Sequence, residues 1–377
     1  MKLLILTSST GGGHDLRANA IAAWAKERQD LGVETEIFRP LEASGALNDF
    51  GVNLYNQIQR KMPAAHHAYW SFLELAGLHR RPWQLSGVQP FVSKLESFRP
   101  DLIISVHAHL NHGYMELARR TLGQNKVKVG TYCGELEDGY GFSRHWVNPK
   151  ADIFIGASEY CCGAAKRIGM VDEKNMLGGF MLRPSSYKAY TETEKAACLE
   201  NHGLDPKRFT LLLATGAVGA NNHQKLLEAL DWTQLDMQVV ALCGKGQTVL
   251  DELNAWKPRH SKILLKALPY IDEMPLMLAS ASALVARGGT GTTSEAILAG
   301  CPLIANGIGG VMPQEMITLK YLRHFGITEK IASARDLPKL IKSWTESPKS
   351  LDEAKERMKS AKPPGEPSAI IERLANL

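Results

Sequence analysis

The chain has 377 residues, of which 44% are hydrophobic and 22% charged, a composition typical of a globular protein long enough for two domains. Its 44 basic and 39 acidic side chains give a net charge of +5, too mild an excess to indicate a nucleic-acid partner. The six cysteines form no Cys-x-x-Cys pair, which argues against a zinc site or a disulfide framework. We therefore expect neither a metal site nor nucleic-acid binding.

No segment has the pattern of a leader or a membrane span. Residues 1–7 contain only a short apolar run before a polar stretch, too short for the core of a signal peptide. No apolar run approaches the roughly 18 residues that a spanning helix needs. We expect a cytoplasmic protein whose contact with a membrane is peripheral.

The chain begins with a predicted strand, loop and helix. Residues 2–7 predict a buried strand, residues 8–13 a glycine-rich loop and residues 14–31 a helix. His14 falls in the first turn of that helix, where the helix dipole favours the neutral imidazole that a general base requires. The alternative is a polar histidine that only caps the helix.

A basic and aromatic segment, residues 57–83, follows. Cationic side chains flank its apolar residues, a pattern that predicts docking on an anionic bilayer or on an amphiphilic substrate. An ordinary amphipathic helix packed on its own domain is the alternative. The residues concerned are Arg60, Lys61, Met62, Tyr69, Trp70, Phe72, Leu73, Arg80 and Arg81.

Short β-rich runs alternate with helical segments along the rest of the chain, which predicts parallel sheets covered by helices. The runs are residues 102–106, 127–132, 153–157, 210–214, 238–243, 263–267, 283–286 and 302–305. Apolar periodicity is lost at residues 181–195, so we expect an α/β protein of two doubly wound, Rossmann-like domains facing a central cleft. The predicted boundaries are 1–182, 183–350, and a C-terminal segment 351–377 that packs back on the first domain.

The second glycine-rich turn, residues 286–300, is the most informative stretch. A strand ends in glycines and hydroxyls and a helix then begins, which directs backbone N–H groups and the positive helix end toward a diphosphate. Glu295, one turn later, can accept hydrogen bonds from ribose hydroxyls. Alternatively it is only a charge near the start of the helix. Neither glycine turn is a G-x-G-x-x-G or P-loop motif, which argues against a dehydrogenase or a kinase.

Three histidines, His107, His109 and His112, follow the predicted strand 102–106. Their spacing is not a recurrent metal-ligand pattern, and no cysteine or carboxylate pair lies near in sequence. Contact with an acceptor, or a plain polar loop, is favoured over a metal site.

Together these motifs resemble the GT-B glycosyltransferases of the monogalactosyldiacylglycerol synthase and diacylglycerol glucosyltransferase type, which are related to MurG. The resemblance covers most of the chain in order. It rests on the segments 7–14, 54–70, 145–149, 242–246, 268–274, 288–295, 300–304 and 313–315.

The resemblance implies an inverting hexosyltransferase that uses a UDP-sugar and needs no other cofactor. The acceptor it implies is a lipid hydroxyl at the inner membrane face. Backbone near Tyr270 and Ile271 is expected to read uracil, and Glu295 to hold the ribose. Gln314 and Glu315 are expected to hold sugar hydroxyls. The full set of implied binding residues is Gly12, Gly13, Gly216, Gly244, Tyr270, Ile271, Met274, Gly289, Thr290, Gly291, Thr292, Glu295, Gln314 and Glu315.

Two departures from the family pattern bear on the catalytic base. Ser9 stands where lipid galactosyltransferases often carry an aspartate, and the loop 134–142 is longer than usual. The base is then His14 or an acid of the Glu135–Asp138 run, with Glu135 the catalytic candidate alongside His14. A soluble acceptor, a UDP-sugar 2-epimerase and a non-catalytic sugar-nucleotide-binding protein remain alternative functions.

Overall fold

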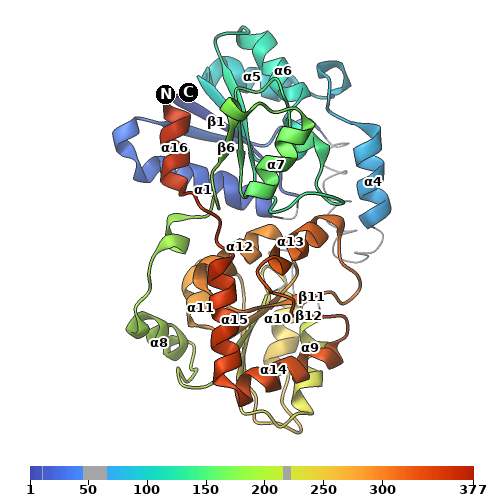
Figure 1. Ribbon diagram of the computed structural model, residues 1–377, viewed down its shortest axis with the longest axis vertical. Helices are drawn as coiled ribbons and strands as arrows, with labels where there is room; N and C mark the ends of the chain where they lie inside the picture. Colours follow the sequence, from blue (N-terminus) through green and yellow to red (C-terminus); the bar gives the residue numbers. More distant parts are fainter. Residues whose placement is uncertain (11, 46–65, 215–221) are drawn as a thin grey trace. The chain divides into compact units, whose positions relative to one another are not determined.

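The computed structural model describes residues 1–10, 12–45, 66–214 and 222–377. The chain folds into two compact units, each with its own parallel sheet (Figure 1). Each unit also has its own apolar core. Unit 1 comprises Met1–Pro184, Met312–Ile317 and Pro363–Leu377, and unit 2 comprises Ser185–Val311 and Thr318–Lys362.

The sheet of unit 1 has six parallel strands in the order β2-β1-β3-β4-β5-β6. Its central strands are apolar on both faces because helices cover both sides, and all four leucine and isoleucine side chains of residues 3–6 are fully buried. The order in which the chain adds strands to the sheet reverses between β1 and β3, which is the switch point of this sheet. The strands are β1 (Lys2–Leu6), β2 (Glu34–Phe38), β3 (Leu102–Ser105), β4 (Lys128–Cys133), β5 (Ile153–Gly156) and β6 (Asn175–Leu177).

The helices of unit 1 include one from the far end of the chain. Helix α16 packs beside α1 (Figure 1), and the Trp24 indole on α1 donates to the Leu182 carbonyl at 2.7 Å. The α-helices are α1 (Gly13–Glu27), α2 (Pro40–Ala43), α4 (His66–Ala76), α5 (Gln89–Phe98), α6 (Gly113–Leu122), α7 (Glu159–Ile168) and α16 (Pro367–Ala375).

The sheet of unit 2 is also six-stranded and parallel, in the order β12-β11-β10-β7-β8-β9. In this sheet the order in which strands are added reverses between β7 and β10, which is its switch point. The strands are β7 (Thr210–Ala214), β8 (Gln238–Leu242), β9 (Leu264–Leu268), β10 (Ala283–Ala286), β11 (Leu303–Asn306) and β12 (Lys330–Ile331).

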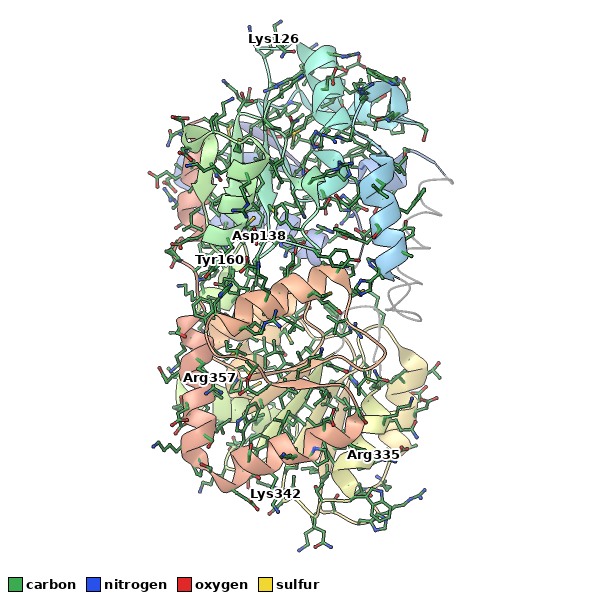
Figure 2. All side chains as sticks on the ribbon, turned by 45° about the vertical axis from the view of Figure 1, so that its right-hand side comes forward. Lys126, Asp138, Tyr160, Arg335, Lys342 and Arg357 are labelled. Carbon is green, nitrogen blue, oxygen red and sulfur yellow. The ribbon has the colours of Figure 1, made fainter. Side chains whose placement is uncertain are left out.

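Helices cover the second sheet, and charged side chains such as Arg335, Lys342 and Arg357 lie on the outside of the unit (Figure 2). Across the described ranges, no helix is long and apolar enough to cross a bilayer. The remaining helices are α8 (Glu192–Asn201), α9 (His223–Asp231), α10 (Gln247–Ala255), α11 (Met274–Ser280), α12 (Thr290–Ala299), α13 (Pro313–Arg323), α14 (Leu337–Glu346) and α15 (Pro348–Ser360). All belong to unit 2 except the start of α13, up to Ile317, which belongs to unit 1.

The expectation of two doubly wound α/β domains is confirmed, and each predicted strand is present to within a residue at either end. The predicted helix 14–31 is wrong at its end. It stops at Glu27 because Arg28 leaves the helical region, and a short 3₁₀ turn, Gln29–Leu31, follows. Strands β2, β6 and β12 were missed, because β2 is charged at alternate positions and the other two are very short.

The C-terminal helix should contribute to the stability of unit 1. Ile370 on α16 is fully buried, so Ile370→Ala should lower the free energy of unfolding by about 2–5 kcal/mol, measured by urea denaturation. The control Arg373→Ala changes an exposed residue of the same helix and should shift it by less than about 0.5 kcal/mol. Equal losses in both variants would show that α16 does not pack as described.

Candidate functional site

The first candidate site lies at the switch point of the unit 1 sheet. Segments that follow β1 and β3 diverge at the carboxyl edge of the sheet, the place where doubly wound folds bind ligands. After β1 the chain passes the glycine loop and enters α1, where Gly12 takes the left-handed conformation at the N-cap, with φ 79°. His14, in the first turn, reaches across to the end of β3, and its Nδ1 lies 2.7 Å from the Val106 carbonyl oxygen.

This contact fixes the tautomer of His14. A carbonyl oxygen can only accept, so Nδ1 carries the proton and Nε2 keeps its lone pair. Burial, assisted by the charge of Arg17, lowers the pKa of His14 to about 4. The imidazole is therefore neutral at pH 7, with an unprotonated Nε2 that can accept a proton.

One imidazole and one indole lie against the His14 ring. The His107 ring meets it edge-on at 4.5 Å between centroids, and the Trp146 ring lies 5.8 Å away. His107 is fixed on both sides, because its Nδ1 accepts from the His109 N–H at 3.2 Å and its Nε2 contacts Thr10 Oγ1 at 3.0 Å. Burial holds the pKa of His107 well below its ordinary value, so this ring is neutral as well.

The remaining histidines extend this group. The His109 ring lies 5.4 Å from that of His145, and the His112 ring 6.2 Å from that of His145. In the part of the chain that the structure describes, no group of three or more His, Cys, Asp or Glu side chains is arranged to hold a metal ion. A role of these histidines in contacting an acceptor stays a prediction.

A carboxylate that the sequence reasoning missed supports the glycine loop. Asp15 accepts hydrogen bonds from Ser9 Oγ at 2.7 Å and Thr7 Oγ1 at 3.2 Å, and it pairs with Arg39 at 3.1 Å. Glu42 accepts from the Ser9 N–H at 2.6 Å. Ser9, which replaces the family's frequent aspartate, is thus bonded to two carboxylates that neighbouring helices supply. The sequence signal was Asp15 at a helix start.

The acids after β4 differ in their surroundings. Glu135 is buried, and burial raises its pKa to about 7 although the Arg17 charge opposes the shift. Its Oε2 is enclosed and has no hydrogen-bond partner within the described residues. Asp138, labelled in Figure 2, instead pairs with Arg167 on α7. Of these two acids, Glu135 is the one placed to exchange a proton near neutral pH.

The second candidate site lies at the switch point of the unit 2 sheet. After β10, Gly289 is the extended N-cap of α12, and the helical hydrogen bonding begins with the Thr293 N–H to the Gly289 carbonyl. The backbone of Thr290–Thr292 therefore opens the helix at its positive end. A Cβ placed on Gly289 or Gly291 would meet no atom within 4 Å, so space is open there. Such a helix start can hold a diphosphate.

Glu295 is buried on the same helix, and its role toward a ribose stays a prediction. Gly216, expected in the loop after β7, lies outside the described residues.

Two further loops end at the same edge of this sheet. Gly244, after β8, has a left-handed φ of 57°, and its carbonyl accepts from the Tyr270 N–H at 2.9 Å. Tyr270 follows β9 and exposes 53% of its surface. Ile271 is next, and Met274 begins α11. The structure thus brings these loops together at the carboxyl edge, while uracil recognition there stays a prediction.

Gln314 and Glu315 occupy the first turn of α13. Glu315 is buried, and its Oε2 accepts from the Met312 N–H at 2.8 Å, so the carboxylate closes the start of its own helix. Binding of sugar hydroxyls by this pair stays a prediction.

Comparisons with known proteins agree with this geometry. Residues 210–306, from the start of β7 to the end of β11, match the glycosyltransferase family 28 C-terminal domain. The chain is 24% identical to monogalactosyldiacylglycerol synthase 1 of Arabidopsis thaliana over 91% of its own length and 64% of that protein. It is also 24% identical to the processive diacylglycerol beta-glucosyltransferase of Staphylococcus saprophyticus, over 100% of this chain and 93% of the relative.

Solved structures share the fold. MurG of Acinetobacter baumannii matches with a TM-score of 0.62 and 15% identity over 100% of this chain and 99% of the other. UGT2 of Phytolacca americana matches with a TM-score of 0.59 and 13% identity over 100% and 98%.

The chain therefore has the GT-B fold and is homologous to monogalactosyldiacylglycerol synthases and diacylglycerol glucosyltransferases, as its motifs predicted, and its residues 210–306 match the glycosyltransferase family 28 C-terminal domain.

Proposed function

We propose that the protein is an inverting glycosyltransferase that moves a hexose from a UDP-sugar to a hydroxyl of a diacylglycerol-like lipid. The observation that carries the proposal is the fixed tautomer of His14 at the switch point of unit 1. The names of the relatives supply the kind of sugar transferred, a hexose, and the diacylglycerol acceptor.

The donor half of the proposal rests on unit 2. The opening turn of α12 offers backbone N–H groups and threonine hydroxyls, which can balance charge on a diphosphate without a metal ion. Glu295, a buried carboxylate further along this helix, suits a pair of ribose hydroxyls.

The chemical step then follows from the protonation state of His14. The acceptor hydroxyl gives its proton to His14 Nε2 while its oxygen bonds to the anomeric carbon. The bond from that carbon to the diphosphate oxygen breaks, and UDP leaves with the electron pair. A single displacement of this kind inverts the anomeric centre.

The membrane part of the proposal rests on α4 and the segment after it. Leu75 exposes 82% of its surface, and Phe72 and Trp83 are also exposed. The Arg81 guanidinium lies 5.0 Å from the centre of the Trp83 ring, and Arg80 is exposed nearby in sequence. Exposed apolar groups flanked by cations suit docking on an anionic bilayer surface.

A groove of about 1210 Å³ adjoins this surface. Six of its lining residues are arginine or lysine, whose charges can attract anionic headgroups. Arg60, Lys61 and Met62, predicted as parts of the same docking segment, lie outside the described residues. Attachment to the inner membrane face is thus part of the proposal.

The Glu295 role can be tested by UDP binding. Glu295→Ala should weaken UDP binding by about 1–3 kcal/mol in calorimetry, because ribose hydroxyls would lose their acceptor. Glu346→Ala removes an exposed carboxylate of the same unit and should leave the affinity unchanged. If both variants bind UDP as the wild type does, Glu295 is not in the nucleotide site.

Substitution of His14 tests the base. In His14→Asn the amide can still donate to the Val106 carbonyl, but no Nε2 remains. Turnover should fall by roughly 10²–10⁴-fold while UDP affinity stays near that of the wild type.

The readout is glycolipid formed from UDP-sugars and diacylglycerol vesicles. Wild-type turnover in His14→Asn would remove His14 as the base. A glycosylated soluble alcohol as the sole wild-type product would indicate a soluble acceptor, and a sugar or UDP-sugar inverted at C2, formed without lipid, would indicate an epimerase.

Vesicle sedimentation tests the docking surface. The double variant Arg80→Gln/Arg81→Gln should bind anionic vesicles roughly tenfold or more weakly, and wild-type binding should fall with salt. The charge-matched control Arg335→Gln/Lys342→Gln changes exposed cations of unit 2 and should bind like the wild type. Equal loss in both variants would point to net charge alone and contradict docking through this surface.

A further inference from the structure

A buried arginine lies close to both candidate proton acceptors. Arg17 exposes only 5% of its surface, although arginine is rarely buried without a specific partner. It follows His14 by three residues on α1, so the two side chains share one face of the helix. Its Nη2 donates to the Gly134 carbonyl at 3.1 Å, which ties α1 to the segment after β4.

Gly134 provides the space that Arg17 fills. A Cβ added at Gly134 would overlap the guanidinium group itself. The position of the Arg17 charge therefore depends on a glycine at this point of the loop, an observation independent of any charge.

The residue after Gly134 is Glu135, which exposes 8% of its surface. The Arg17 charge opposes the burial that raises the pKa of Glu135, and it adds to the burial that lowers the pKa of His14. On β4, burial raises the pKa of Tyr132 against the opposing Arg17 charge. Burial and the neighbouring Cys161 raise the pKa of Cys133, with a smaller contribution from Glu135.

One buried cation thus acts in the same direction on two different groups. A positive charge disfavours the imidazolium and favours the carboxylate, and both effects yield a group that can accept a proton. We propose that Arg17 is a positioning residue that anchors the Gly134–Glu135 segment to α1 and holds both His14 and Glu135 in their proton-accepting forms. Only the expected effect of Arg17 on activity rests on the proposed transfer reaction.

The pH dependence of kcat/KM separates this role from a merely structural one. In Arg17→Met both groups should hold protons more tightly, so the acid limb of the profile should move to higher pH by about 0.5–1 unit. Arg17→Lys keeps the positive charge but lacks the planar guanidinium group, so it should move the acid limb by less than Arg17→Met does. Arg28→Met, which removes a partly exposed arginine paired with Asp30, is the matched control and should leave the acid limb in place.

Gly134→Ala tests the same role of Arg17 without changing Arg17 itself. The new methyl group should displace the guanidinium without removing its charge, so the limb should move in the direction seen for Arg17→Met. The double variant Arg17→Met/Gly134→Ala should add little to the single change, because both act through one group. If Arg17→Met does not fold, Arg17→Lys and Gly134→Ala still give the shift.

A titration without substrate separates this inference from the proposed function. Carbon-13 NMR of labelled glutamate carboxyls, with Glu135→Gln for assignment, should show a higher Glu135 pKa in Arg17→Met and Gly134→Ala than in the wild type. This shift in a protein that transfers no sugar would support the Arg17 role and count against the proposed function. Active variants whose acid limb and Glu135 titration both match the wild type would overturn the inference.

Discussion

The hydrogen bond from His14 Nδ1 to the Val106 carbonyl joins the two segments that diverge from the switch point of the unit 1 sheet. It can form because β1 and β3 are adjacent and parallel, so the residues after them emerge at one edge. The backbone carbonyl has no proton to give, and this fact alone decides which imidazole nitrogen is basic. The glycine loop, the first turn of α1 and the neutral His107 ring all support that one orientation.

Burial shifts the pKa values of the surrounding histidines and of Glu135 in opposite directions. It makes the histidines neutral at physiological pH and raises the pKa of Glu135 to about 7. Such divergence between titratable neighbours is typical of sites that move protons. In unit 2 the corresponding edge carries open glycines and a helix start and lacks such a histidine group among its described residues, an environment that suits a diphosphate.

Sequence reasoning predicted the parts of the fold that periodicity and composition determine. The central strands were found because they are continuous apolar runs, whereas β2 was missed because its polar residues reflect a position at the sheet edge. His14 was found because glycines and a helix start mark it. Arg17 was missed because an arginine in a helix normally reaches solvent, and only the loop at Gly134 shows that it is buried. Asp15 and His145 likewise acquire their neighbours through tertiary packing, which no local pattern encodes.

Nitrogen-15 NMR of the histidine rings, with His14→Asn used for assignment, tests the central claim most directly. We expect His14 to be a neutral Nδ1–H tautomer at pH 7 and to take up its second proton only near pH 4. A proton on Nε2 at pH 7, or protonation of His14 at or above its ordinary pKa of about 6.5, would contradict it.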